Sequence, residues 1–197
     1  MLAAKNWIAN FFLAAWALVL LGVIAALSLR HAASLPLPND EARLADAAMQ
    51  LRRASGKNFL VDVIDSDCSC ARSLFGHLVS RGPFRGVEEL ILFVGADPKK
   101  RELAERSGFE FAALSDNELI SRFGIESAPV LLVFNAAGRL RYAGGYYDHP
   151  AAITPVDERI HRQLDSGAHV EPLPVFGCAV SQRLRDALDP LRLRSSK

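Results

Sequence analysis

Three short apolar runs restrict the fold of this chain more than any other feature. They are Phe59–Ile64, Leu90–Val94 and Val130–Phe134, and each has almost no polar side chain. Runs of this length are typical of strands that are buried on both faces of a sheet. Stretches with helical spacing of apolar residues separate them, and strands that alternate with helices predict an α/β domain with helices on both faces of a mixed sheet.

Turn and capping residues define the other expected elements. A helix is expected where apolar residues recur at helical spacing after a capping residue, and a hairpin where a turn sequence separates two strands. We therefore expect helices over about 40–53, 71–80, 98–108 and 154–166, another helix that starts at 115–118, a short strand over 109–114, and a hairpin strand over 139–144.

An almost uninterrupted apolar segment lies near the amino terminus, from Trp7 to Leu29. At a helical rise of ~1.5 Å per residue it would be roughly 34 Å long, enough to cross a bilayer core of ~30 Å. The apolar part of a secretory signal is usually only ~7–15 residues long. The sequence therefore predicts a transmembrane helix over 7–29, and a cleaved signal peptide is the alternative.

Charges around this segment do not decide its orientation. Lys5 precedes it and Arg30 follows it, so the positive-inside rule gives nearly a tie. Cysteine pairs that exchange disulfides are more useful outside a reducing cytosol. We therefore expect residues 1–6 in the cytoplasm and the remaining domain outside it.

One domain is expected after the apolar segment. Residues 30–39 form a linker that contains two prolines, 40–170 form the domain, and 171–197 form an extension that carries Cys178. The net charge of +1 argues against broad nucleic-acid binding, so no nucleic-acid partner is expected.

The three cysteines are the candidate reactive groups. Cys68 and Cys70 follow the first apolar run and precede a helix, where unpaired helix N–H groups favour a thiolate. Residues i and i+2 point to nearly opposite sides of a helix, so a Cys68–Cys70 disulfide requires a non-helical segment. Cys178 has three open interpretations: a structural disulfide with Cys68 or Cys70, a resolving cysteine, or a free thiol.

His77 adds a second interpretation of the cysteine pair. It lies two helical turns after Cys70 and faces roughly the same side. Cys68, Cys70 and His77 could therefore bind Cu(I) or Zn through thiolate and imidazole ligands. No cofactor is otherwise expected, and copper is the alternative.

Two further patterns resemble a known family. Leu60-Val61-Asp62 ends six residues before Cys68, the spacing in thioredoxins between a Leu-Val-Asp strand and the first active-site cysteine. The segment 123–130, with Ala128-Pro129-Val130, and the hairpin and glycines over 134–145 resemble the thioredoxin stretch that holds the cis-proline. The resemblance covers roughly residues 57–166 and implies a thioredoxin-like fold.

The chain departs from that family at the second cysteine. Thioredoxins have Cys-x-x-Cys, whereas here Ala71 occupies the place of the second cysteine. The sequence is more similar to membrane-tethered bacterial thioredoxin-like proteins with Cys-x-Cys and a late Gly-Cys. The resemblance implies that Cys68 is the exposed nucleophile, that Asp62 is a buried proton acceptor, and that Pro129 is cis and faces the cysteines beside a backbone edge that pairs with an extended substrate.

These observations lead to one expected function. The protein is expected to be a thiol–disulfide oxidoreductase of the bacterial inner membrane, with a single span and a periplasmic domain, acting on a protein thiol or disulfide. Cys68 would attack, and Cys70 or Cys178 would release the mixed disulfide. A copper chaperone or a non-catalytic assembly factor on the same fold are the alternatives.

Overall fold

The computed structural model describes residues 2–31, 34–54, 56–66 and 68–188. The chain divides into two compact units, Met1–Ala33 and Ser34–Lys197. Each unit is described by itself.

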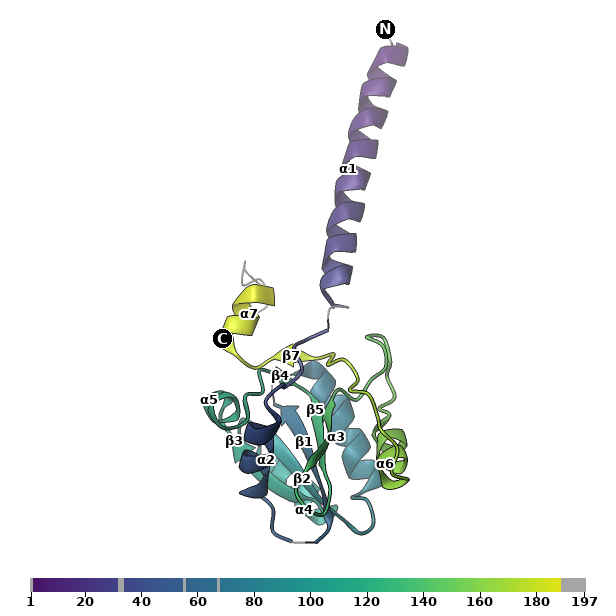
Figure 1. Ribbon diagram of the computed structural model, residues 1–197. Coiled ribbons are helices and arrows are strands. Elements are labelled where there is room, and N and C mark those ends of the chain that lie inside the picture. Colours follow the sequence, from purple (N-terminus) through teal and green to yellow (C-terminus); the bar gives the residue numbers. More distant parts are fainter. Residues whose placement is uncertain (1, 32–33, 55, 67, 189–197) are drawn as a thin grey trace. The chain divides into compact units, whose positions relative to one another are not determined.

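The first unit is a single helix, α1 (Leu2–His31) (Figure 1). It contains the whole segment 7–29, and large apolar side chains such as Trp7, Phe11 and Trp16 are exposed on it. Among the described residues, no helix combines the length and apolar character that crossing a membrane requires. The transmembrane helix over 7–29 stays a prediction.

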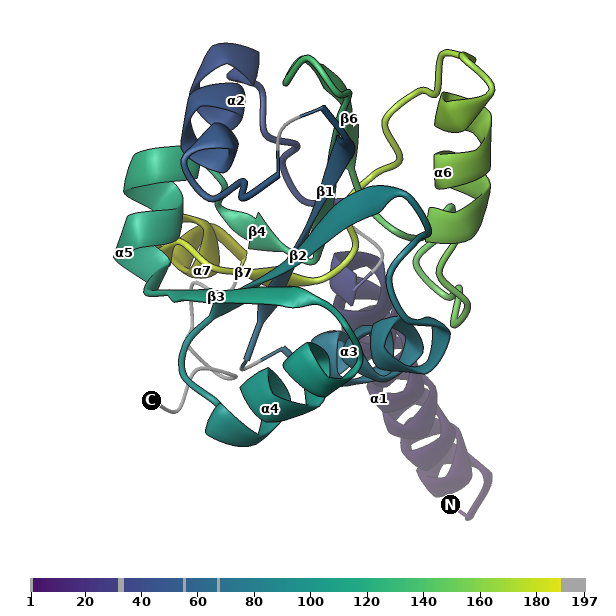
Figure 2. The same cartoon turned by 90° about the horizontal axis from the view of Figure 1, so that it is seen from below.

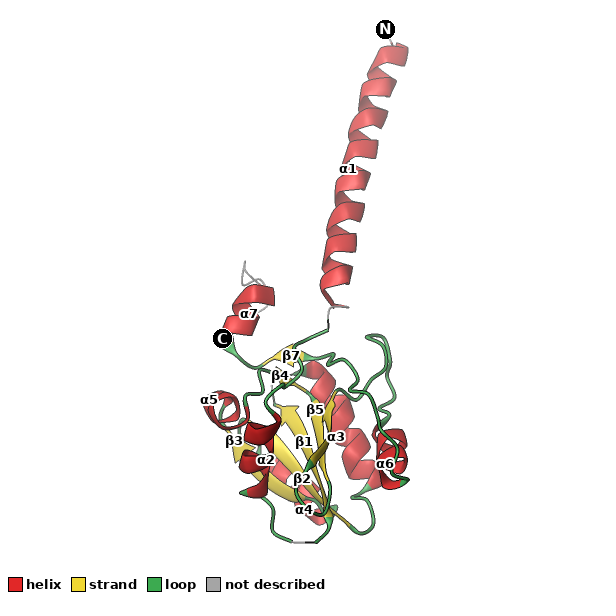
Figure 3. Cartoon of the chain, in the orientation of Figure 1, coloured by secondary structure: helices red, strands yellow, loops and turns green. Residues whose placement is uncertain are grey.

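The second unit is built around a five-stranded mixed sheet (Figure 3). Its strand order is β3-β2-β1-β5-β6, in which β1, β2 and β3 are parallel and β5 is antiparallel to both β1 and β6. The expected mixed α/β sheet flanked by helices is confirmed. The strands are β1 (Asn58–Asp65), β2 (Val87–Val94), β3 (Glu110–Leu114), β5 (Val130–Phe134) and β6 (Leu140–Gly144).

Helices α2, α4 and α5 begin where the sequence supplies capping side chains. Asp40 accepts a hydrogen bond from the Arg43 N–H at 3.0 Å, and Asp97 caps the helix that starts with Pro98. Ser115 and Glu118 form a capping box. The helices are α2 (Glu41–Met49), α3 (Ser69–Arg81), α4 (Pro98–Arg106), α5 (Asp116–Glu118), the π-helical turn η1 (Leu119–Phe123), α6 (Asp157–Asp165) and α7 (Gln182–Leu188).

Helices cover both faces of the sheet, and each face has its own apolar core (Figure 2). Alternate residues of β1 point to opposite faces. On one face Phe59, Val61 and Val63 pack with α2, η1 and α7. On the other face Leu60 and Ile64 pack with α3, α4 and α6. Asp62 lies between these two residues in the alternation, so its side chain belongs to the face that α3 covers.

A second, two-stranded sheet joins the middle of the chain to its carboxyl-terminal segment. It pairs β4 (Ser127–Ala128) with β7 (Cys178–Ala179) in antiparallel register. The segment after residue 170 therefore packs within the same unit as the domain, and Val175 and Leu184 are buried in its core. At the other end, Leu35 forms a β-bridge with Val175.

Packing of α3 on the sheet gives a first prediction. Leu78 of α3 is fully buried against the sheet, whereas Leu103 of α4 is 47% exposed. Leu78→Ala is expected to lower the free energy of unfolding by about 2–5 kcal/mol, because it leaves a cavity in a packed core. Leu103→Ala is expected to change it by less than about 0.5 kcal/mol. Denaturant unfolding of the oxidised full chain measures both, and equal effects would contradict the assigned core.

Candidate functional site

Cys68 lies at the entrance of α3, directly after the loop that follows β1. In this disulfide-bonded form it is buried, 3% exposed, and not exposed as the resemblance implied, because it packs in the core beneath α3. It is the N-cap residue of the helix, with φ −82° and ψ 123°, and its carbonyl accepts a hydrogen bond from the Ala71 N–H at 3.1 Å. The first N–H groups of a helix have no partner within it, and they stabilise a negative charge placed there. A thiolate on Cys68 would receive this stabilisation.

The Cys68 sulfur is bonded to Cys178. The two Cα atoms are 5.7 Å apart, and the residues are 110 positions apart in the sequence. Cys178 is therefore not a free thiol in this structure. Its disulfide with Cys68 agrees with both a structural and a resolving role. The side chain of Cys70 lies outside the described residues; its backbone belongs to the first turn of α3.

Residues 176–181, which we name the strap, bring Cys178 to this position. Cys178 is opposite Ala128 and Ala179 is opposite Ser127 in the β4–β7 pair. The Val180 N–H donates to the Glu126 carbonyl at 2.7 Å and so continues the pairing. The Ala128–Pro129 peptide bond, which directly follows β4, is cis. The strap, Pro129 and Cys68 thus meet at one place.

Gly177 is required by the closeness of the two backbones. A Cβ atom at this position would lie 2.0 Å from the Ala128 carbonyl oxygen and 2.7 Å from Cδ of Pro129. Real Cβ atoms do not approach backbone atoms so closely, so any side chain would push the strap away from β4. The space, rather than an unusual backbone conformation, selects glycine here.

Asp62 is fully buried on the same sheet face as Cys68. Its Oδ1 accepts a hydrogen bond of 2.5 Å from the Tyr146 hydroxyl, and its Oδ2 is buried with no hydrogen-bond partner among the described residues. Burial, followed by the negative charge of Glu89, raises the pKa of Asp62 well above its usual value. The neutral acid is therefore the favoured form at this position.

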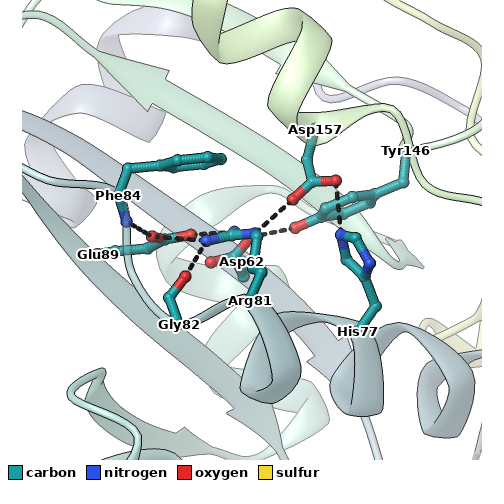
Figure 4. A network of polar contacts seen from close by, with 8 residues as sticks. All are labelled: Asp62, His77, Arg81, Gly82, Phe84, Glu89, Tyr146 and Asp157. Carbon is teal, nitrogen blue, oxygen red and sulfur yellow. Dashed lines mark hydrogen bonds and ion pairs between the residues drawn. The ribbon is translucent and has the colours of Figure 1, made fainter.

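A cluster of charged side chains surrounds this carboxyl group (Figure 4). Arg81 of α3 pairs with Glu89 of β2, and its Nε donates to Asp157 of α6 at 2.7 Å. His77 Nε2 lies 2.9 Å from the other oxygen of Asp157. The side chains of Glu89 and Asp157 are fully buried, and that of His77 is 25% exposed. The cluster therefore extends from the interior to solvent.

Electrostatics within the cluster fix which groups are charged. Burial opposes the charge of Arg81, but its hydrogen bond with Glu89 and the charge of Glu89 outweigh this and hold the guanidinium pKa above its ordinary value. Burial, and then the charge of Asp62, raises the pKa of Tyr146 well above its ordinary value. Tyr146 thus remains a neutral hydrogen-bond donor to Asp62.

The alternative metal site of Cys68, Cys70 and His77 stays a prediction, because the side chain of Cys70 lies outside the described residues. Cys68 is bonded to Cys178, and His77 contacts Asp157. In the described part of the chain, no group of three or more His, Cys, Asp or Glu side chains could hold a metal ion.

Sequence reasoning missed the surroundings of Asp62. The sequence GGYY over 144–147 suggests a turn with exposed aromatic side chains, but Tyr146 is fully buried and Tyr147 nearly so. The reason is that both belong to the core formed with α3 and α6. The available signal for the cluster was Glu89, the second of two adjacent acids before the apolar run of β2.

The raised pKa of Asp62 predicts a dependence of stability on pH. Between the unfolded pKa, ordinarily about 4, and the higher folded pKa, the folded protein binds more protons, so stability falls as pH rises, by at most about 1.4 kcal/mol per pH unit. Asp62→Asn is expected to remove this loss of stability. The free energy of unfolding of the variant, relative to that of the natural protein, is therefore expected to rise between pH 4 and 8. Denaturant unfolding across this range tests it, with the exposed Asp46→Asn as the control. Parallel pH profiles for Asp62→Asn and the natural protein would contradict the assignment.

Similarity to known proteins is found among solved structures. No family model and no curated protein matches the chain. Among solved structures, an uncharacterised conserved protein from Geobacillus kaustophilus is 18% identical, with a TM-score of 0.49, over 76% of this chain and 90% of that one. A hypothetical protein from Sinorhizobium meliloti 1021 is 18% identical, with a TM-score of 0.47, over 76% and 91%.

A further match is a secreted disulfide oxidoreductase from Mycobacterium tuberculosis, which is 15% identical with a TM-score of 0.40, over 56% of this chain and 83% of that one. Identities this low concern the fold alone. The strand order and helix placement are those of a thioredoxin-like fold. The second unit is thus a mixed α/β domain, consistent with the fold that the sequence resemblance implies, with a Cys68–Cys178 disulfide at the entrance of α3.

Proposed function

We propose that the protein is a thiol–disulfide oxidoreductase that acts on protein partners, with Cys68 and Cys178 as its redox couple. The observation that carries the proposal is the disulfide between these residues at the first turn of α3. Helix entrances lower the pKa of a cysteine placed there, so Cys68 is both a good attacking thiolate and a good leaving group.

The exchange takes place in two steps that balance. In the reduced protein the Cys68 thiolate attacks one sulfur of a partner disulfide, which forms a mixed disulfide and releases the other partner sulfur as a thiolate. The Cys178 thiolate then attacks the Cys68 sulfur, forms the observed disulfide and releases the second partner thiolate. The partner disulfide gains two electrons and the cysteine pair of the protein loses two.

The same steps run in reverse when the partner is a dithiol. The direction follows the difference between the reduction potentials of the two couples. Descriptions of similar structures support the reaction class: they include a thiol-disulfide oxidoreductase from Bacteroides vulgatus and the secreted disulfide oxidoreductase from Mycobacterium tuberculosis.

Cysteine substitutions test this proposal. Cys68→Ser is expected to lower the rate of insulin-disulfide reduction by dithiothreitol to the uncatalysed rate, because the attacking thiolate is lost. Cys178→Ser is expected to accumulate the mixed disulfide with insulin, visible as a reducible adduct, because resolution is lost. Cys70→Ser is expected to retain exchange, and Leu103→Ala serves as the unrelated control.

Two results would contradict the proposal. Full activity of Cys68→Ser would remove the assigned nucleophile. Loss of exchange in Cys70→Ser, with exchange retained in Cys178→Ser, would make Cys70 the resolving cysteine and the Cys68–Cys178 disulfide a structural one.

The proposal includes a location at the bacterial inner membrane, with the domain in the periplasm. The apolar run over 7–29 and the use of a disulfide outside a reducing cytosol support it. The full chain is expected to stay in the membrane pellet after alkaline extraction and to be cleaved by protease added to spheroplasts. Release into the supernatant, or protection until the inner membrane is lysed, would contradict this location.

A further inference from the structure

The strap lies along β4 as an added strand. Its pairing with β4 is main chain to main chain, with Cys178 opposite Ala128 and Ala179 opposite Ser127. At Glu126, the residue before β4, the Val180 N–H donates to the carbonyl, and the Ser181 hydroxyl adds one side-chain bond to the carboxylate at 3.2 Å. Main-chain pairing uses groups that every extended segment carries, so an edge paired in this way can also accept an extended segment from another chain.

Few side chains hold the strap on β4. Phe176, Cys178 and Ala179 are only partly buried, Gly177 has no side chain, and Val180 is its one buried apolar residue. A two-residue strand pair is short, so the covalent bond to Cys68 is the strongest constraint on the strap. Once this bond is broken, the strap is held by the short strand pair, by the buried Val180 and by hydrogen bonds from Arg185 to the Ala179 and Val180 carbonyls.

The contacts at Gly177 determine which sequences can pair with β4 beside Pro129. The carbonyl of Ala128 and the ring of Pro129 occupy the position of a Cβ atom at residue 177. A segment that places a cysteine sulfur against Cys68 in this register must therefore have glycine directly before that cysteine. The requirement applies equally to the strap and to a segment of another protein.

From these contacts we propose that the strap and the partner protein compete for the edge of β4. In the oxidised protein the strap covers the edge; after reduction it leaves, and an extended partner segment with a Gly-Cys sequence takes its place beside Pro129. This inference rests on the proposed oxidoreductase function and adds to it the partner's recognition sequence and the self-blocked oxidised state.

A peptide with the sequence of residues 172–181 is the probe. Its cysteine is activated as a mixed disulfide with thionitrobenzoate, and the protein is the full-length Cys70→Ser/Cys178→Ser variant, which retains only Cys68. The Cys68 thiolate attacks the peptide sulfur, the bond to the aromatic sulfur breaks, and the coloured thionitrobenzoate thiolate leaves. Its absorbance gives the rate.

One substitution is then made in both molecules, and the two effects are expected to have opposite signs. Gly→Ala before the cysteine of the peptide is expected to slow the reaction at least tenfold, because the alanine side chain overlaps the Ala128 carbonyl. Gly177→Ala in the protein is expected to speed the reaction with the original peptide at least threefold, because it removes the competing strap from β4.

Two controls separate the causes. Gly76→Ala places a methyl group in open space on α3 and is expected to leave the rate unchanged. The thionitrobenzoate disulfide of N-acetylcysteine, which is too short to pair with β4 as a strand, is expected to react equally with all the protein variants. It also shows that each variant is folded with an accessible Cys68.

The outcomes distinguish this inference from the proposed function. Equal rates for the glycine and alanine peptides, or a slower reaction in the Gly177→Ala protein, would overturn the competition while Cys68 still reacts with the small disulfide. Failure of Cys68 to react even with the small disulfide would refute the oxidoreductase function, and this inference with it.

Discussion

Burial of β1 on both faces is the constraint on which the rest of the structure depends. Strands β2 and β5 pair with its two edges, and helices cover its two faces. Every residue from Phe59 to Asp65 is buried, so an acid in this strand has no access to water. Asp62 must therefore be neutral or find its partners inside the protein, and Tyr146 and the Arg81 cluster supply that environment.

The same strand sets the place of the disulfide. Its carboxyl end is where the chain leaves the interior, and Cys68 is among the first residues after it. The disulfide closes a loop of 110 residues there. In the chain-entropy model this lowers the entropy of the unfolded chain and so stabilises the folded domain by about 4–5 kcal/mol. Domains are stable by only about 5–15 kcal/mol. Reduction of this bond therefore removes a stabilisation that equals a large fraction of the free energy of unfolding of the whole domain.

Local patterns predicted the frame of the domain well. The continuous apolar runs gave β1, β2 and β5, and the capping residues Asp40 and Ser115 gave the starts of two helices. These signals lie within a few residues of one another, so a single sequence is sufficient to show them. A thioredoxin-like fold could be inferred because such elements appeared in the right order.

Contacts between distant residues could not be predicted in this way. Tyr146 is 84 positions from Asp62, and Arg81 is 76 positions from Asp157. The burial of Tyr146 depends on α3 and α6, which no local pattern around residue 146 reveals. For the same reason the partner of Cys178 stayed open, because the pairing of β7 with β4 joins segments about 50 residues apart.

The residues next to the strap connect the redox couple with the beginning of the domain. Val175, just before the strap, accepts a hydrogen bond from the Leu35 N–H at 2.8 Å, and the Ser127 hydroxyl of β4 donates to the Pro36 carbonyl at 3.0 Å. The first described residues of the second unit are thus fastened to β4 and to the residue just before the strap. If the strap leaves β4 on reduction, the hydrogen bond between Leu35 and Val175 loses the ordered segment that directly follows it. The length of chain free to move ahead of the sheet would then depend on the oxidation state of Cys68.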